Sequence, residues 1–437
     1  MTGRRYATRM RLLLAAILTV ALAACQPDAA SSTNTASDTA PPVTAAFVAK
    51  PWQLPSPAGA AQPDLIATSD GLLLSWVSPD ADGHALQFAR FADGQWSAAQ
   101  TIARGDDWFV NWADTPHLAA TADGVLWAHW LQQSADAPYA YDVVLVRSDD
   151  SGASWSEPLR VNDDGTPTEH GFVSLWPASG DSLGIAWLDG RETAAASGHA
   201  GHDAHAGHAG GTMTLRAARF DAGLLRSGES VLDAATCDCC QTDAAMTARG
   251  PLLVYRDRSP EEVRDIVVTR FDGNRWSDPA PVHADHWTMP ACPVNGPAVD
   301  ARGDTALVGW YTAANDIPTL KIARSIDAGD RFGAPVEVDA GAAVQGRVDV
   351  AIDERAAWVL WTREDDDGQT LQLARYTPDL SRQLQRIELA HLQGRGRGTG
   401  FPQLVLAGDT VHVAWTDVID GQPRLQGVVL RDSENVE

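Results

Sequence analysis

The chain has 437 residues, a length that would ordinarily suggest two or three domains. Its formal net charge is −24 at pH 7, and removal of residues 1–24 would take away four arginines and no acidic residue, which leaves a net charge near −28. A surface this acidic argues against nucleic acid or an anionic bilayer surface as the partner, and it is compatible with cationic ligands, including metal ions.

The beginning of the chain has the features of an export signal. A basic stretch precedes the apolar run Leu12–Leu22, which is too short to span a bilayer as a stable helix. The next residues, Ala23-Ala24-Cys25, complete a motif that resembles a bacterial lipobox. The resemblance implies cleavage before Cys25 and lipidation of its thiol, with an ordinary signal peptide cut nearby as the alternative. By the sorting convention of such lipoproteins, Gln26 after the cysteine implies the outer membrane.

A tether follows the signal. Residues 25–46 are rich in Ser, Thr, Ala and Pro and contain no aromatic residue, so they cannot bury enough surface to become ordered. We expect a lipidated cysteine, a flexible linker, and a folded domain that occupies residues 47–437.

The folded domain is built from a sevenfold repeat. Each unit has a short apolar run, a turn with Asp or Gly, and a second apolar run that ends in an aromatic residue. These runs are four to eight residues long and rich in β-branched and aromatic residues, which is typical of strands. The aromatic residues are separated by 54, 57, 68, 55, 51 and 54 residues, and the longest interval holds a His-rich insertion at about 192–212. They are Trp76, Trp130, Trp187, Tyr255, Trp310, Trp361 and Trp415.

Each unit continues with a third and a fourth strand, such as ALQFARF and WSAAQTIA in the first unit. Four strands in roughly 50 residues, repeated, predict an all-β fold, a β-propeller of four-stranded blades. Seven blades are preferred, and six are the main alternative. The last unit has no fourth strand of its own. The run from Phe47 to Pro55 matches such a strand, so we expect the N-terminal strand to close the last blade and remove an exposed edge.

Two turns between third and fourth strands match the Asp-box pattern Ser-x-Asp-x-Gly-x-x-Trp. The aspartate folds onto nearby backbone amides, the glycine supplies a positive φ, and the aromatic residue packs between sheets. On these turns, the domain resembles the sialidase-like (BNR, Asp-box) propeller superfamily over nearly all of residues 47–437. In that family the Asp-boxes are structural and lie away from the active site. The two sets are Ser148, Asp150, Gly152 and Trp155, and Ser325, Asp327, Gly329 and Phe332.

The propeller topology predicts which face carries function. Loops that lead into first strands share one face with loops that join second to third strands, and ligands favour places where several loops converge. This face collects the cysteine cluster Cys237, Cys239 and Cys240, and also Cys292 and the His-rich loop. Cys292 precedes the first strand of the unit after the cluster, so we expect it to lie beside the cluster.

Three kinds of chemistry are open to these four cysteines. In an oxidising compartment an even number favours disulfides, although any scheme with two bridges must join two members of the cluster. Adjacent cysteines such as Cys239 and Cys240 have Cα atoms about 3.8 Å apart, closer than a disulfide prefers. A soft-metal site for Cu(I) or Zn(II) and a redox-active dithiol are the alternatives.

The His-rich loop could collect a divalent ion, because four imidazoles and one carboxylate fall within ten residues separated by Gly and Ala. The alternative is a low-complexity insertion with no role. The imidazoles belong to His199, His202, His205 and His208.

The resemblance to sialidases also implies specific catalytic residues: an arginine cluster that binds the substrate carboxylate, a Tyr–Glu nucleophile pair, and an Asp that acts as the acid/base. Arg256, Arg347 and Arg363 come from three different blades and could form such a clamp, or they could pair with neighbouring acids in structural networks. Tyr311 is the best-placed tyrosine, but no partnering glutamate is evident. The Phe/Tyr-Arg-Ile-Pro signature of the family is missing, and seven blades exceed its usual six.

The sequence therefore favours an envelope lipoprotein whose propeller is a ligand-binding module with a Cu or Zn site, and it leans away from an enzyme. The alternatives are an exo-glycosidase of sialidase type and a structural subunit of an envelope complex. The expected partners are the membrane lipid at Cys25 and a glycan or an envelope protein, and no nucleic acid.

Overall fold

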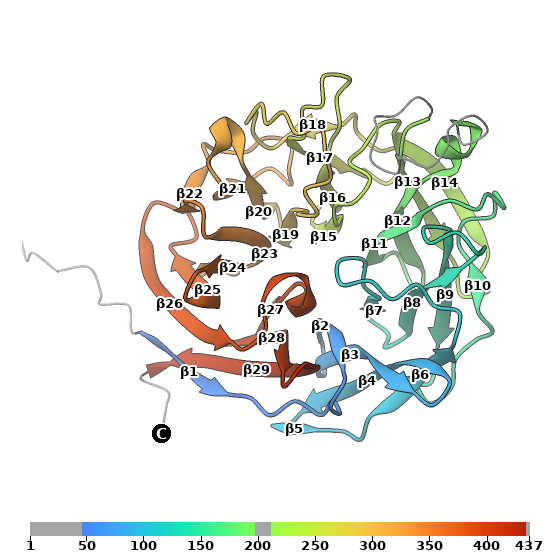
Figure 1. The fold of residues 1–437 in the computed structure, drawn as a ribbon, viewed down its shortest axis with the longest axis horizontal. Coiled ribbons are helices and arrows are strands. Elements are labelled where there is room, and N and C mark those ends of the chain that lie inside the picture. The colour runs from blue at the N-terminus through green and yellow to red at the C-terminus, as the bar shows by residue number, and fades with distance from the viewer. Residues whose placement is uncertain (1–45, 197–210, 434–437) are drawn as a thin grey trace, which may run out of the picture. The chain divides into compact units, whose positions relative to one another are not determined.

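The structure, a computed structural model, describes residues 46–196 and 211–433, which contain seven antiparallel sheets arranged around a common axis (Figure 1). The predicted seven-bladed all-β propeller is confirmed. The predicted signal peptide, Cys25, most of the tether and the four loop histidines lie outside the described residues. Helical turns in the described part are short 3₁₀ segments, and none of its helices is long and apolar enough to cross a membrane. They are η1 (Arg191–Ala196), η2 (Ala314–Asp316) and η3 (Gly396–Thr399).

The blades follow one another along the chain, each with its first strand at the axis. Blade 1 contains β2 (Ala61–Thr68), β3 (Gly71–Asp80), β4 (Gly83–Ala92), β5 (Gln95–Trp96) and β6 (Gln100–Gly105). Blade 2 contains β7 (Leu118–Ala120), β8 (Leu126–Gln133), β9 (Tyr141–Ser148) and β10 (Leu159–Arg160). Blade 3 contains β11 (His170–Pro177), β12 (Leu183–Asp189), β13 (Thr214–Phe220) and β14 (Arg226–Asp233).

The other four blades repeat this order. Blade 4 contains β15 (Asp243–Thr247), β16 (Gly250–Arg256), β17 (Ile266–Arg270) and β18 (Ala280–Pro281). Blade 5 contains β19 (Ala298–Arg302), β20 (Thr305–Thr312), β21 (Thr319–Ser325) and β22 (Val336–Ala340). Blade 6 contains β23 (Val344–Ile352), β24 (Ala357–Asp365), β25 (Gly368–Tyr376) and β26 (Gln383–Leu392). Blade 7 contains β27 (Gln403–Ala407), β28 (Thr410–Ile419), β29 (Gln422–Asp432) and the N-terminal β1 (Phe47–Pro51).

The second strand of each blade is apolar on both sides because a neighbouring blade covers each of its faces. In β12, for example, every residue is buried, and Trp187 is inaccessible to water. The buried side chains of the described residues form seven hydrophobic clusters, each shared by two adjacent blades. The stability of the ring therefore depends on every junction between blades.

The N-terminal strand closes the ring as predicted. Figure 1 shows β1, in blue, beside β29, in red, and the two strands pair antiparallel from Phe47↔Asp432 to Pro51↔Val428. Trp52 and Leu54 follow β1 into the cluster between blades 7 and 1. Because β1 pairs with β29, the outer edge of β29 is not left open.

Carboxylates of the inner strands tie several blades to the next. Asp64 accepts a hydrogen bond from the backbone N–H of Leu118 at 2.7 Å, and Asp349 accepts one from Leu404 at 2.6 Å. Asp243 makes the same contact with Val299 at 2.7 Å. These acidic side chains line an axial cavity of about 690 Å³. Their carboxylates are already hydrogen-bonded to neighbouring blades, so they have a structural role.

The two Asp-box turns have the local geometry that the sequence predicts. Ser148 Oγ donates to Asp150 Oδ1 and accepts from the N–H of Gly152, both at 2.8 Å. Gly152 has φ = +91°, and Trp155 lies edge-on against Phe88 with ring centroids 6.1 Å apart. The second turn repeats these contacts with Ser325, Asp327, Gly329 and Phe332.

Candidate functional site

The loops that lead into the first strands meet around the axis on one face, which we call the axial face. Gln241 of blade 4 donates to the carbonyl of Ala113 in blade 2 at 2.7 Å and accepts from the N–H of Gly296 in blade 5 at 2.9 Å. Asn295 of blade 5 continues the chain of contacts and accepts from the N–H of Arg347 in blade 6 at 2.9 Å. Loops from blades 2, 4, 5 and 6 are thus connected by polar contacts, as the predicted convergence requires.

The cysteine cluster and Cys292 form one site. Cys239 and Cys292 are joined by a disulfide across the loops of blades 4 and 5, which confirms the predicted proximity. Cys237 and Cys240 are free thiols with exposed fractions of 1% and 2%. Cys237 Sγ lies 3.3 Å from Cys240 Sγ and 3.9 Å from Cys239 Sγ. The strained bridge between adjacent Cys239 and Cys240 is avoided because Cys239 pairs with Cys292 instead.

The two thiols have different electrostatic surroundings. Burial raises the pKa of the Cys237 thiol well above its ordinary value, and its hydrogen bond to Cys240 adds to the shift. Burial acts in the same direction on Cys240, but the Cys237 hydrogen bond, the Arg256 charge and the N–H of Asn295 outweigh it and lower the pKa to about 7. Cys240 is therefore the sulfur on which negative charge is most stable, with Cys237 as its hydrogen-bond donor.

Arg256 and Arg264 lie close enough to the cluster to act on its thiols electrostatically. Arg256 is buried and donates to the carbonyls of Asn295 and Tyr311, both at 2.7 Å, and its guanidinium lies 4.9 Å from the ring centre of Trp287. Arg264 is also buried, and its Nε and Nη1 atoms make no hydrogen bond. Arg256 thus supports the loops and the thiols, and it does not face solvent as a carboxylate clamp would.

The other two predicted clamp residues have partners of their own. Arg347 is buried, donates to Thr399 Oγ1 at 2.8 Å, and lies 5.1 Å from the ring centre of Trp112. Burial lowers the pKa of Arg347 to about 10, and the charge of Arg397 contributes. Arg363 pairs with both carboxylate oxygens of Asp339, at 2.7 and 2.6 Å, which matches the structural alternative for this residue.

Tyr311 remains a candidate without a glutamate partner. Its ring lies 5.7 Å from that of Trp287 at 73°, and its backbone carbonyl receives Arg256. Burial raises the pKa of its phenol, while the Arg256 charge opposes the shift. The roles of the arginines and of Tyr311 in catalysis stay predictions.

Sequence reasoning missed an acidic group on the same face. Burial raises the pKa of Glu169 to about 8, and the carboxylates of Asp238 and Asp114 contribute. Burial likewise raises the pKa of Asp114 to about 7, although the N–H of Phe172 opposes the shift. Tyr141 directs its hydroxyl toward Asp114 Oδ2 at 3.4 Å. Asp114, Glu169 and Asp238 all lie in loops that lead into first strands, those of blades 2, 3 and 4, and this loop position is the signal that the sequence offered.

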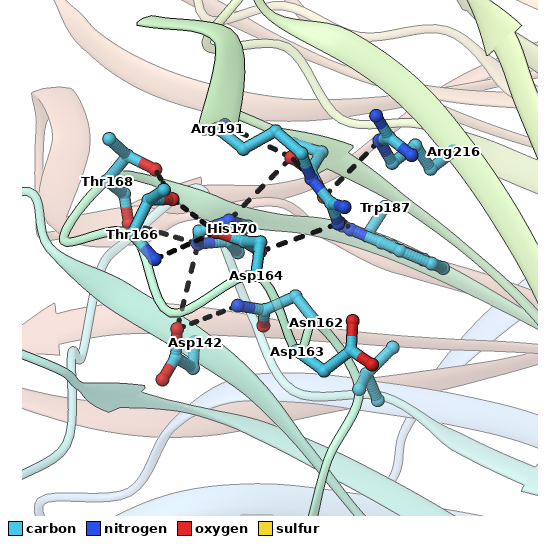
Figure 2. A network of polar contacts seen from close by, with 12 residues as sticks. Asp142, Asn162, Asp163, Asp164, Thr166, Thr168, His170, Trp187, Arg191 and Arg216 are labelled. Carbon is cyan, nitrogen blue, oxygen red and sulfur yellow. Dashed lines mark hydrogen bonds and ion pairs between the residues drawn. The ribbon is translucent and has the colours of Figure 1, made fainter. Parts of the chain in front are cut away.

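Figure 2 shows the network that holds the loop before β11. His170 is fully buried, and its Nδ1 lies 3.0 Å from the carbonyl oxygen of Tyr141, so this nitrogen carries a proton. Its Nε2 lies 3.1 Å from Asp164 Oδ2 and 3.7 Å from Asp189 Oδ1. Asp189 already accepts from Arg191 Nε at 2.7 Å and from Trp187. We therefore interpret His170 and its acids as a polar network that holds the loop on which Glu169, its neighbour in the chain, lies.

This chain is similar to known proteins in its fold alone. No protein-family model and no curated protein matches this chain. Among solved structures, the polysaccharide lyase Uly1 has 7% identity and a TM-score of 0.49, over 87% of this chain and 91% of that chain. The α-L-arabinanase of Penicillium chrysogenum has 14% identity and a TM-score of 0.46, over 87% and 95% of the two chains. The NanB sialidase of Streptococcus pneumoniae has 8% identity and a TM-score of 0.45, over 88% and 94%.

Proposed function

We propose that the axial face binds a soft metal ion, with Cu(I) as the preferred ion, at the cysteine cluster. The observation that carries this proposal is the pair of buried free thiols Cys237 and Cys240, whose sulfur atoms lie 3.3 Å apart. An ion about 2.3 Å from each of two sulfurs spans separations up to about 4.6 Å, so this separation falls within its reach. Thiolate sulfur is the ligand that selects Cu(I) and Zn(II) over harder ions.

The oxidation state of the four cysteines, one disulfide and two free thiols, favours Cu(I) over Zn(II). Two free thiols can hold Cu(I), whereas a structural zinc site needs four ligands. The remaining sulfurs, Cys239 and Cys292, are in the disulfide and become ligands only after reduction. Arg256 and Arg264 supply positive charge near the thiols, which offsets the negative charge of a metal dithiolate. We therefore expect Cu(I) in the disulfide form and Zn(II) only in the fully reduced form.

The envelope location completes the proposal. A lipid anchor at Cys25 would hold the propeller at the outer membrane, and the histidines at 199, 202, 205 and 208 would collect metal ions. Cys25→Ser should move the protein from the membrane fraction to the soluble fraction. Unchanged fractionation would remove the anchor from the proposal while leaving the metal site to its own test.

The metal site is tested by anaerobic titration of the Cys25→Ser protein with Cu(I) against a chromogenic chelator. One tightly held Cu(I) per chain is expected, and Cys237→Ser or Cys240→Ser should abolish it. A matched control is replacement of the loop histidines at 199 and 202 by Gln, which should leave the tight site and remove only weaker binding. Equal Cu(I) affinity in the cysteine variants and the parent would contradict the proposal.

A glycosidase of the exo type is the second candidate, and one observation favours it. Glu169, with its pKa raised to about 8, is protonated at neutral pH and so is suited to act as a general acid, with the Asp114–Tyr141 pair nearby. Hydrolysis of aryl glycosides and of a generic sialoside by the wild type, lost in Glu169→Gln, would promote this function. Absence of turnover on a broad panel of glycosides would leave the binding function in first place.

A further inference from the structure

We propose that the four cysteines form a thiol–disulfide relay. In this relay the buried pair Cys237/Cys240 exchanges electrons with the disulfide Cys239–Cys292, and through it with an external protein or small-molecule disulfide. The relay uses the same sulfur atoms as the metal site but requires no metal ion.

The sulfur atoms form a path from the surface to the interior. Cys292 is exposed, and its disulfide partner Cys239 is half-buried. From Cys239 Sγ the next sulfur, that of the buried Cys237, lies 3.9 Å away. Cys240 Sγ, also buried, lies a further 3.3 Å from Cys237 Sγ. Each step is therefore close to van der Waals contact, and only the outer end of the path meets solvent.

The surroundings of the inner pair are those of a reactive thiol site. Structural cysteines that stay inert lie in apolar surroundings, whereas reactive cysteines lie next to positive charge. Arg256 and Arg264 flank the pair, and Arg264 is buried with its Nε and Nη1 free of hydrogen bonds. The N–H of Asn295 points at Cys240 Sγ at 3.4 Å. Arg264 Nη2 donates to Glu262 at 2.8 Å, so the positive charge beside the thiols is shared with a carboxylate.

The geometry defines the first step of the exchange. Cys237 gives its proton to solvent and attacks Cys239 Sγ, which lies 3.9 Å away. A Cys237–Cys239 bond forms, the Cys239–Cys292 bond breaks, and Cys292 leaves as a thiolate that takes a proton from water. The step moves no net electrons, because one disulfide replaces another.

The second step resolves this intermediate. Cys240 loses its proton to water and attacks Cys237 Sγ, so that a Cys237–Cys240 bond forms and Cys239 leaves as a thiolate. Two electrons have now moved from the inner pair to the outer pair. The outer thiols can then reduce an external disulfide, whose two sulfurs take up the two electrons and two protons as the Cys239–Cys292 bond forms again. An external dithiol drives the same steps in reverse.

The relay is tested by trapping on the native protein, kept folded and free of metal with a chelator. A bulky polyethylene-glycol maleimide cannot reach the buried thiols, but it captures Cys292 whenever exchange releases it. After denaturation and a second, small alkylator, peptide mapping is expected to find the bulky label on Cys292 together with a Cys237–Cys240 disulfide. Labelling confined to Cys237 or Cys240 with Cys239–Cys292 intact, or no labelling, would overturn the relay.

Two variants sharpen the test. Cys237→Ser removes the inner nucleophile, so the rate of labelling on Cys292 should fall at least tenfold. Cys240→Ser removes only the resolving thiol, so Cys292 should still be labelled, with a Cys237–Cys239 disulfide in place of the Cys237–Cys240 disulfide. Unchanged labelling of Cys292 in folded Cys237→Ser would also overturn the relay, and the wild-type map decides the matter should a variant not fold. Because chelator is present throughout, failure of Cu(I) binding and failure of the relay are separate results.

Discussion

Phe47, at the start of the first strand, pairs with Asp432 near the end of the last strand, so the two ends of the described chain meet in one ladder. The same residue is also held from the other side. Gln385 of blade 6 accepts from the N–H of Phe47 at 2.9 Å and donates to its carbonyl at 2.8 Å. The ring centre of Phe47 lies 4.9 Å from that of Trp358, and the two ring planes meet at 72°. The N-terminal strand therefore links blade 7 to blade 6 as well as completing blade 7.

Deletion of residues 47–56 should destabilise the whole ring, because it removes a strand of blade 7 and the side chains of Trp52 and Leu54 from the cluster between blades 7 and 1. Trp52→Ala alone should lower the free energy of unfolding by about 3–5 kcal/mol. Urea unfolding followed by tryptophan fluorescence measures the effect. Deletion of residues 26–45 and the exposed-site variant Val48→Ala are the controls, and equal stability of all four proteins would refute this account of closure.

Loss of the Cys239–Cys292 disulfide should also destabilise the domain. The bridge joins residues 53 positions apart, and the chain-entropy model assigns a loop of this length about 4 kcal/mol. The double variant Cys239→Ser/Cys292→Ser should melt well below the wild type, and dithiothreitol should lower the melting temperature of the wild type but not of the variant. A reductant effect of equal size on both proteins would assign the stabilisation to something other than this bridge.

The sevenfold repeat makes the architecture predictable from the sequence alone. Aromatic residues such as Trp187 recur once per unit because the second strand is buried between blades, and that burial imposes the same residue type seven times. Closure by Phe47–Pro51 followed from the strand missing at the end. The meeting of Cys292 with the cluster followed from equivalent positions in adjacent blades.

Pairings between residues at unrelated positions could not be predicted in this way. Three pairings are possible for four cysteines, and the repeat does not choose among them. Arg363 shares no motif with its partner Asp339, which lies 24 residues away on the last strand of the preceding blade. The group of Glu169 and Asp114 escaped notice because neither lies in a catalytic motif, and its unusual protonation depends on burial, which only the folded chain provides.

Gly152→Ala should be more damaging than Gly94→Ala, although both glycines have positive φ, +91° and +77°. A Cβ on Gly152 would lie 2.2 Å from Cζ of Phe88, whereas a Cβ on Gly94 would meet no atom within 4 Å. We expect a loss of about 1 kcal/mol for Gly94→Ala from backbone strain alone. Gly152→Ala should lose roughly 1–3 kcal/mol more from the clash. Denaturant midpoints measured at constant slope check the order, and similar losses would show that Phe88 moves aside freely.

The pH dependence of stability should reveal the burial of Asp114. Its pKa is raised to about 7 in the folded protein, whereas an unfolded aspartate titrates near 3.8. Between these values the folded state binds more protons than the unfolded state, so this residue makes stability fall as pH rises from about 4 to 7, by at most about 4 kcal/mol. Above pH 7 its contribution is constant.

Asp114→Asn should remove this part of the pH dependence, because an amide does not ionise and its oxygen can still accept from the N–H of Phe172, which lies 2.7 Å from the present carboxylate. The variant is therefore expected to gain stability over the wild type at pH 8 and to approach it at pH 4. The measurement is urea unfolding at intervals between pH 4 and 8, with the exposed-site variant Asp70→Asn as the control. A difference between Asp114→Asn and wild type that stays constant across this range would show that Asp114 is ionised in the folded protein throughout, and that its environment on the axial face stabilises the charge.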